Sequence, residues 1–126
     1  MAKTVDIFLT RLSAARIQNV GCFREANPLN MRDGAIICIG LGNPDWNFSA
    51  PHGAGRTCSR TDAKYAYSVE EFQEQMKGVY TTTANTGTID ECPMAYKAPE
   101  GIISVIGDTV NIEKTIRPIY NFKACN

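Results

Sequence analysis

The sequence predicts an α+β fold in a single domain. A short apolar segment at residues 35–40 lies between glycines, and a strong helix-capping pattern begins at Ser68. Strand and helix patterns do not alternate regularly along the chain, which argues against a parallel α/β sheet. The 126 residues correspond to about one domain and suffice for one hydrophobic core, so they cannot hold a large multidomain enzyme.

Composition and charge exclude several classes of protein. Lys+Arg and Asp+Glu each number 13, so the net charge is zero, which excludes a strongly basic, non-specific nucleic-acid binder but allows a local basic patch. A hydrophobic content of 44% with 21% charged residues is typical of a globular protein. No run of 18 apolar residues exists, so we expect no membrane span.

The amino terminus and the cysteines point to a cytoplasmic protein. The first residues lack a long apolar stretch and a small-residue cleavage site, so no secretory signal is expected. The cysteines are odd in number and irregularly spaced, which disfavours a disulfide framework and a structural zinc site. They are Cys22, Cys38, Cys58, Cys92 and Cys125.

The first half of the chain contains one predicted helix, one predicted strand and a long loop. Apolar residues at helical spacing predict an amphipathic helix over residues 4–20, with Thr4 as its N-cap. Residues 35–40 predict a buried strand. From Gly40 to Gly55 the chain is rich in glycine and proline, which predicts a loop.

The second half mixes both element types. Ser68 begins a capping box with Glu71, and the helix that follows ends near Gly78. Residues 79–83 predict a strand, residues 84–94 an irregular segment, and Pro99 the start of another helix. Residues 111–122 alternate loosely, and Pro118 among them favours an edge strand or a bulge.

The residues with the clearest chemical potential surround His52, the single histidine of the chain. Gly53 and Gly55 allow a close approach of the backbone to a ligand, and free N–H groups in such a turn bind anions. Arg56 and Arg60 suit phosphate because of the fork geometry of guanidinium. A neutral imidazole can also attack phosphorus. The pattern therefore suggests a histidine beside a phosphate-binding loop.

Other interpretations of these residues stay open on the sequence alone. A single histidine in a glycine loop is commonly a hydrogen-bonded loop residue, and a pair of His52 with Cys58 would lack a third, orienting group. Residues 28–34 form a tight turn, in which Asn30 and the acidic residue Asp33 favour local side-chain hydrogen bonds.

Several motifs resemble the tRNA-splicing ligase RtcB family. Residues 51–60 read Pro-His-Gly-Ala-Gly-Arg-x-x-Ser-Arg and follow Gly-Asn-Pro-Asp-Trp-Asn-Phe-Ser-Ala. Further matches lie at residues 68–72, 90–97 and 117–124, and the resemblance runs from about residue 28 to residue 124. It implies a GTP- and manganese-dependent RNA ligase that joins 3′-phosphate or 2′,3′-cyclic phosphate ends to 5′-hydroxyl ends.

The resemblance also implies roles for individual residues. His52 resembles the nucleophile that takes GMP from GTP, and Gly53, Ala54 and Gly55 resemble the backbone cradle of the nucleotide. Ala35 stands where many members have a serine. The remaining positions that match nucleotide contacts of the family are Pro28, Leu29, Asn30, Met31, Tyr96 and Lys123.

The resemblance covers only the carboxy-terminal portion of the family fold, in residues 27–126, and residues 1–26 do not match it. The family's manganese ligands lie upstream, so we expect no metal ligand in this chain. The first hypothesis is a truncated guanylylation region that needs an upstream half in trans. The second is a module that binds a guanine nucleotide or an RNA end without catalysis, and the third is a non-functional remnant.

Overall fold

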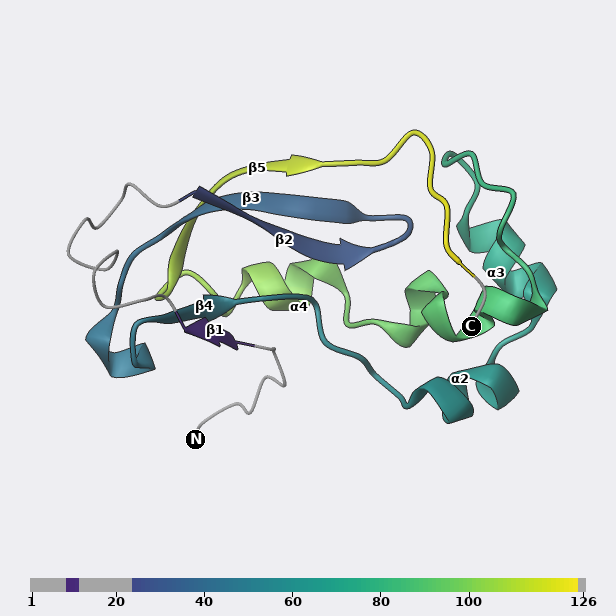
Figure 1. Cartoon of the computed structure of the whole chain (residues 1–126), viewed down its shortest axis with the longest axis horizontal. Coiled ribbons are helices and arrows are strands. Elements are labelled where there is room, and N and C mark those ends of the chain that lie inside the picture. The colour runs from purple at the N-terminus through teal and green to yellow at the C-terminus, as the bar shows by residue number, and fades with distance from the viewer. Residues whose placement is uncertain (1–8, 12–23, 125–126) are drawn as a thin grey trace.

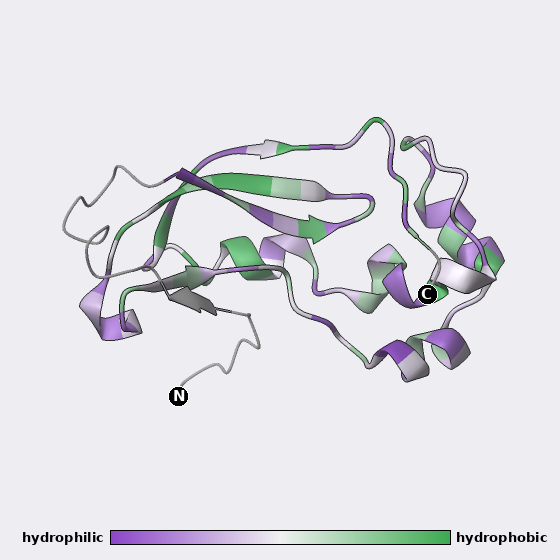
Figure 2. Cartoon of the chain, viewed as in Figure 1, coloured by the Kyte–Doolittle hydropathy of each residue, from purple (hydrophilic) through white to green (hydrophobic). Residues whose placement is uncertain are grey.

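A three-stranded antiparallel sheet forms the upper layer of the computed structural model, which describes residues 9–11 and 24–124 (Figure 1). Its strands are β2 (Arg24–Asn30), β3 (Gly34–Gly40) and β5 (Val110–Ile116), with β3 in the centre. Figure 2 marks β3 as the most continuously hydrophobic of the three. The α+β class and the strand expected over residues 35–40 are confirmed.

β2 and β3 form a hairpin whose turn is closed by the side chain of Asn30. Its Oδ1 accepts a hydrogen bond from the backbone N of Asp33 at 2.9 Å, and its Nδ2 donates to Asp33 Oδ2 at 2.8 Å. The side-chain turn expected from these two residues is therefore confirmed. Strand β2 itself was not predicted, because it is polar and contains Pro28. At the edge of a sheet, however, the missing N–H of a proline costs no ladder hydrogen bond.

Helix α4 (Pro99–Ile103) lies below the sheet (Figure 1), and its residue Ile102 is buried in the hydrophobic cluster beneath the sheet. The helix expected to begin at Pro99 is confirmed. Each fully buried aliphatic side chain stabilises the fold by roughly 1.5–3 kcal/mol. We call this group the sheet cluster, and it consists of Leu29, Ile36, Cys38, Ala50, Ala54, Ile102, Ile106 and Val110.

A second group of buried side chains gathers around α2 (Arg60–Ala66) and α3 (Val69–Gln75) and two 3-10 helices, Thr86–Glu91 and Pro93–Ala95. The capping box at the start of α3 is confirmed, with Ser68 and Glu71 bonded reciprocally. Helix α2 was not predicted, although Ser59 caps it. We call this group the helical cluster, and it consists of Met31, Ala63, Phe72, Met76, Ile89, Cys92 and Ala95.

Two side chains connect the clusters. Met31, at the tip of the β2–β3 hairpin, is 1% exposed and packs into the helical cluster, although Leu29, two residues earlier in β2, belongs to the sheet cluster. Tyr96 contacts both clusters. The hairpin therefore anchors the sheet to the helices.

The helix predicted over residues 4–20 is wrong at residues 9–11, which are the part of it that the structure describes. Leu9–Arg11 forms strand β1, which pairs antiparallel with β4 (Ser49–Pro51). The other residues of that predicted helix lie outside the described part of the chain. The loop expected from Gly40 to Gly55 also holds a 3-10 helix, Pro44–Trp46, in addition to β4. Pairing between distant segments favours the extended backbone at both places, and helical periodicity cannot reveal it.

The strand expected over residues 79–83 is also wrong. Only Tyr80 pairs, in an isolated parallel bridge with Tyr120. The hydroxyl of Thr81 instead accepts a hydrogen bond from the backbone N of Thr83 at 3.2 Å, which turns the backbone locally. Residues 84–94, expected to be irregular, contain the 3-10 helix Thr86–Glu91 and the start of the next one. Pro118 follows β5, which is an edge strand as expected.

Cys38, Cys58 and Cys92 are free thiols in the described part of the chain. Burial is the main cause that raises the pKa of Cys38 to about 11, with Glu25 and Glu113 nearby adding to it. Among residues 9–11 and 24–124, no helix has the length and hydrophobicity needed to cross a membrane.

Replacing Gly34 should destabilise the fold. Its φ is +81°, and an added Cβ would lie 2.0 Å from the carbonyl oxygen of Ile116 on the neighbouring strand. We expect Gly34→Ala to lower the free energy of unfolding by about 2 kcal/mol or more, measured by urea denaturation. The matched control is Gly101→Ala in α4, which has open space around it and should be neutral or stabilise by up to about 1 kcal/mol. Equal stability of Gly34→Ala and the wild type would contradict this prediction.

Candidate functional site

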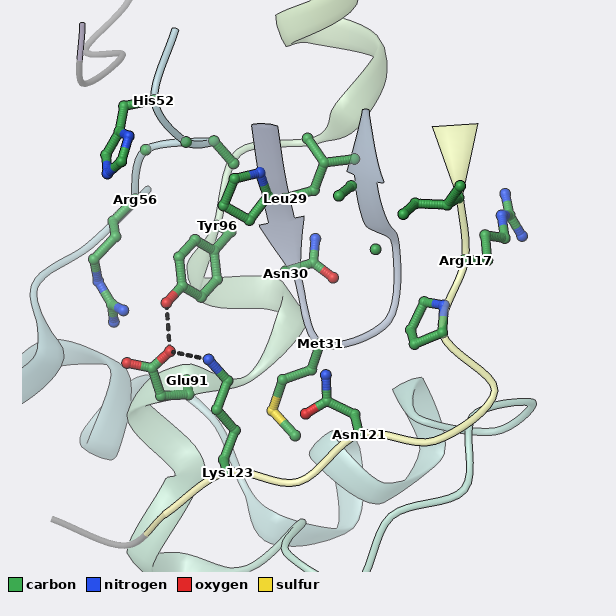
Figure 3. A pocket seen from close by; sticks show the side chains of 18 of the residues that line it. Leu29, Asn30, Met31, His52, Arg56, Glu91, Tyr96, Arg117, Asn121 and Lys123 are labelled. Atoms are coloured by element: carbon green, nitrogen blue, oxygen red, sulfur yellow. Dashed lines mark hydrogen bonds and ion pairs between the residues drawn. The ribbon is translucent and has the colours of Figure 1, made fainter. Parts of the chain in front are cut away.

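A cavity of about 720 Å³ opens beside the tip of the β2–β3 hairpin. This volume is in the range of small-molecule sites, which is about 300–1,000 Å³. Its wall contains residues from four separate parts of the chain (Figure 3). All the site residues expected from the sequence line it, namely Pro28, Leu29, Asn30, Met31, Ala35, His52, Gly53, Ala54, Gly55, Tyr96 and Lys123. Their individual roles stay predictions.

His52 lies at the edge of this cavity, directly after β4. Its side chain is exposed and makes no hydrogen bond within the described residues, so the alternative of a hydrogen-bonded loop histidine finds no support there. Cys58 packs against the helical cluster and does not line the cavity, which disfavours a nucleophile pair with His52. Burial raises the pKa of Glu25, and the charge of nearby His52 partly offsets that effect.

The loop after His52 is held by backbone pairing to the segment around Tyr96. Arg56 and Tyr96 form an antiparallel bridge, and Lys97 N donates to Gly55 O at 3.1 Å. Gly55 is buried with a φ of +71°, a conformation that favours glycine. Gly53 is not among the residues with a positive φ.

Arg56 is fixed on the cavity wall by three contacts. Its Nε donates to Cys58 O at 3.1 Å and its Nη2 to Asp90 O at 2.6 Å. The guanidinium carbon lies 5.0 Å from the ring centroid of Tyr96, which is a cation–π distance. The third nitrogen, Nη1, is buried without a hydrogen-bond partner in the described residues. It is a donor that a bound anion could satisfy.

Glu91 is the electrostatic centre of the cavity wall (Figure 3). Its side chain is only 12% exposed, and its Oε2 accepts a hydrogen bond from the Tyr96 hydroxyl at 2.6 Å. Lys123 Nζ lies 3.4 Å from the same oxygen, and Arg60 Nη1 bonds the other one. One carboxylate thus positions three side chains from different segments.

These contacts shift the pKa values of the groups involved. Burial alone would raise the pKa of Glu91, but the hydrogen bonds from Tyr96 and Arg60 and the charge of Lys123 together lower it below its usual value. Burial, and then the hydrogen bond to Glu91, raise the pKa of Tyr96 to about 12. At neutral pH Glu91 is therefore an anion and Tyr96 a neutral hydrogen-bond donor.

The sequence predicts that Arg60 and Asn30 contact a ligand, but in the structure both side chains form hydrogen bonds within the protein. Arg60 lines the cavity, but its Nη1 is bonded to Asp90 and Glu91, so Arg56 has the more available donor. The amide of Asn30 closes the hairpin turn.

Sequence reasoning missed three polar residues of the wall, namely Glu91, Arg117 and Asn121. The Oδ1 atom of Asn121 is buried and has no hydrogen-bond partner in the described residues. All three lie inside segments 90–97 and 117–124, which resemble the RtcB family. Their position in these segments was the one signal in the sequence that could have identified them as site residues.

A metal donor set is not found in the described part of the chain. Residues 9–11 and 24–124 contain no group of three His, Cys, Asp or Glu side chains that could hold an ion. The manganese that the family resemblance implies therefore does not fit the described residues. The unpartnered Arg56 Nη1 and Asn121 Oδ1, together with Lys123 on the wall, do fit a ligand with both phosphates and N–H donors.

Comparison with known proteins settles the family. The sequence model of the tRNA-splicing ligase RtcB family matches residues 23–124. The chain belongs to the RtcB family. The RNA-splicing ligase RtcB of Escherichia coli strain K12 is 35% identical over 116 residues, which is 90% of this chain and 27% of that protein. The tRNA-splicing ligase RtcB of Aeropyrum pernix is 36% identical over 83 residues, which is 62% of this chain and 17% of that protein.

This chain therefore spans about a quarter of the length of the Escherichia coli relative, whose alignment covers 27% of that protein. The cavity and all its lining residues lie inside the stretch that the RtcB family model matches. The division of the chain near residue 26 stays a prediction.

Removing the charge of Glu91 should change the pH dependence of stability. Because its pKa is lower in the folded protein than in the unfolded chain, its contribution is present above the unfolded value of about 4.3 and is lost as the pH falls through the folded value. We expect Glu91→Gln to be less stable than the wild type at pH 7, with a difference that shrinks below about pH 4.

The measurement is urea denaturation across this pH range. Tyr96→Phe should lose part of the same pH dependence, since it removes one donor to Glu91. The matched control is Tyr80→Phe, which removes a hydroxyl outside the cavity and should keep the wild-type profile. A constant difference between Glu91→Gln and the wild type from pH 3 to pH 7 would contradict the prediction.

Proposed function

We propose that this chain provides the guanine-nucleotide site of a GTP-dependent RNA ligase of the RtcB type, which joins RNA 3′-phosphate or 2′,3′-cyclic phosphate ends to 5′-hydroxyl ends. One observation carries the proposal. A single cavity brings an exposed histidine together with a glycine-containing backbone turn, a buried guanidinium donor and an ammonium group. The proposal includes a cytoplasmic location, supported by the odd number and irregular spacing of the cysteines.

In the proposed reaction the neutral imidazole of His52 attacks the α-phosphorus of GTP. A nitrogen–phosphorus bond forms, the bond from the α-phosphorus to the bridging oxygen breaks, and pyrophosphate leaves with the electron pair. The product is a histidine–GMP intermediate, ready for transfer of GMP to an RNA 3′-phosphate. In-line attack requires an imidazole free to rotate toward the ligand, and the exposed His52 satisfies that requirement.

The cavity wall would bind the nucleotide through the following groups. The backbone of Gly53–Gly55 and the Nη1 atom of Arg56 are donors for phosphate oxygens, and Lys123 adds a positive charge. Asn121 Oδ1 is an acceptor suited to a guanine N–H, and the ring of Tyr96 offers an apolar surface to the base. RNA ends and the guanine nucleotide are thus the proposed partners.

The metal ions of the proposed reaction would have to be held by residues other than those described. We therefore expect the chain by itself to ligate no RNA, and to need an upstream RtcB part supplied in trans. The lack of a metal donor set among the described residues also favours a second candidate function, a module that binds a guanine nucleotide or an RNA end without catalysing a reaction. The two candidates differ in whether His52 becomes covalently modified.

Labelling with GTP that carries ³²P in its α-phosphate separates these functions. We expect weak label on the chain in the presence of Mn²⁺, stable on a denaturing gel and absent from His52→Ala. The binding module instead predicts GTP affinity that survives His52→Ala, with no label on either protein. A folded chain that neither binds GTP nor takes up label would overturn both candidates. A cooperative thermal transition, measured first, shows that the sample is folded.

Removing Lys123 should weaken GTP binding. A charge-assisted hydrogen bond contributes about 1.5–3 kcal/mol, so Lys123→Met should raise the Kd for GTP roughly tenfold or more in titration calorimetry. The matched control is Lys114→Met, which removes an exposed lysine of β5 outside the cavity and should leave the Kd unchanged. Equal affinities of Lys123→Met and the wild type would exclude Lys123 from the nucleotide site.

A further inference from the structure

Two polar side chains interrupt the apolar face that strand β2 turns toward the sheet cluster. Burial alternates along this strand, so Glu25, Asn27 and Leu29 point to the same side of the sheet. Glu25 and Asn27 lie opposite Cys38 and Ile36 of β3, which are both 0% exposed. Apolar residues are expected at such positions, because a polar group loses its hydration there. The two polar residues therefore cost the fold stability and call for another explanation.

Both side chains have hydrogen-bonding capacity that the described residues do not use. Asn27 is 1% exposed, and neither its Nδ2 nor its Oδ1 has a partner among residues 9–11 and 24–124. Glu25 is half-buried, and its Oε1 accepts a contact from Cys38 Sγ at 3.9 Å. A thiol is a weak donor, so the carboxylate can accept a stronger one.

The structure brings His52 to this pair. Strand β4 runs below the sheet (Figure 1), and its residue Ala50, two positions before His52, is buried in the sheet cluster. Immediately after His52, a Cβ added to Gly53 would lie 3.8 Å from the carbonyl oxygen of Pro28 in β2. The segment that carries His52 thus passes along β2. In agreement with this placement, burial raises the pKa of Glu25 and the charge of His52 opposes that effect.

The other ionisable groups around Glu25 are already paired or neutral. Arg24 points to the opposite face of β2 and pairs with Glu113 of β5 at 2.7 Å. Cys38 is a neutral thiol at pH 7, because burial, and then Glu25 and Glu113, raise its pKa to about 11. Glu25 does not line the cavity, so it acts on His52 from behind the cavity wall.

We infer that Glu25 is a positioning residue for His52, an inference that rests on the proposed function. The imidazole is exposed, and the attraction of the carboxylate favours the orientation in which one ring N–H faces Glu25. The other ring nitrogen, with its lone pair, then faces the cavity. The buried amide of Asn27, at the next inward position of β2, can donate to the same carboxylate.

This arrangement assigns Glu25 a part in the proposed reaction. When the lone-pair nitrogen of His52 bonds to the α-phosphorus and pyrophosphate leaves, the ring keeps the proton on its other nitrogen and becomes positively charged. The anionic Glu25 stabilises that charge, as a carboxylate does for an imidazolium in other nucleophilic sites. It also supplies the third, orienting group that the residues next to His52 in the sequence do not contain.

NMR spectroscopy tests the contact without any nucleotide. The chain has a single histidine, so in the full chain without a histidine tag the imidazole signals belong to His52. Glu25→Gln should lower the pH midpoint at which these signals titrate by roughly 0.5 pH units or more, because a nearby anion favours the protonated ring. Urea denaturation at pH 7 should show Glu25→Gln to be at least as stable as the wild type, since burial disfavours the charge that is removed.

The matched control is Glu113→Gln, which removes a carboxylate of the same sheet that is paired with Arg24. It should leave the midpoint of the His52 signals unchanged. Equal midpoints in Glu25→Gln and the wild type, or the same fall in Glu113→Gln, would overturn the inference.

Uptake of label from GTP with ³²P in its α-phosphate, in the presence of Mn²⁺, tests the role in the reaction. We expect the initial rate in Glu25→Gln to fall about tenfold or more, with an unchanged Kd for GTP because Glu25 lies outside the cavity. Glu25→Asp, which keeps the carboxylate, should recover part of the rate. A wild-type rate in Glu25→Gln would overturn the inference. A wild-type chain that takes up no label would refute the proposed function, and the NMR midpoints would still decide whether Glu25 acts on His52.

Discussion

The burial of Met31 in the helical cluster is the contact on which the rest of the structure depends. The sheet and the helices have separate hydrophobic clusters, and the hairpin tip inserts one side chain from the first layer into the second. Because Met31 is 1% exposed, the hairpin cannot shift without opening a hole in the helical cluster. The cavity exists because this contact holds the two layers beside each other while Asn30 and Gly34 shape the turn between them.

Within that frame, the carboxylate of Glu91 organises the polar wall. A nearly buried anion is costly unless it is paired, and here it accepts a hydrogen bond from Tyr96 and faces Arg60 and Lys123. The same contacts give the site two different kinds of donor, since Tyr96 stays neutral while Lys123 is 40% exposed and carries a charge. The interactions that stabilise the wall therefore also prepare it for a ligand with both apolar and anionic parts.

Local patterns in the sequence by themselves determined the capped helix α3, the central strand β3 and the helix that begins at Pro99, because each depends on neighbours within a few residues. The resemblance to RtcB motifs identified many of the residues that line the cavity but not Glu91, Arg117 and Asn121, and physical patterns alone left His52 ambiguous. Only the tertiary structure decided that Leu9–Arg11 and Arg24–Asn30 are strands and that Glu91 meets Tyr96 and Lys123. Strand pairing and ion pairing join residues far apart in the chain, and their energies depend on distances that no local sequence pattern contains.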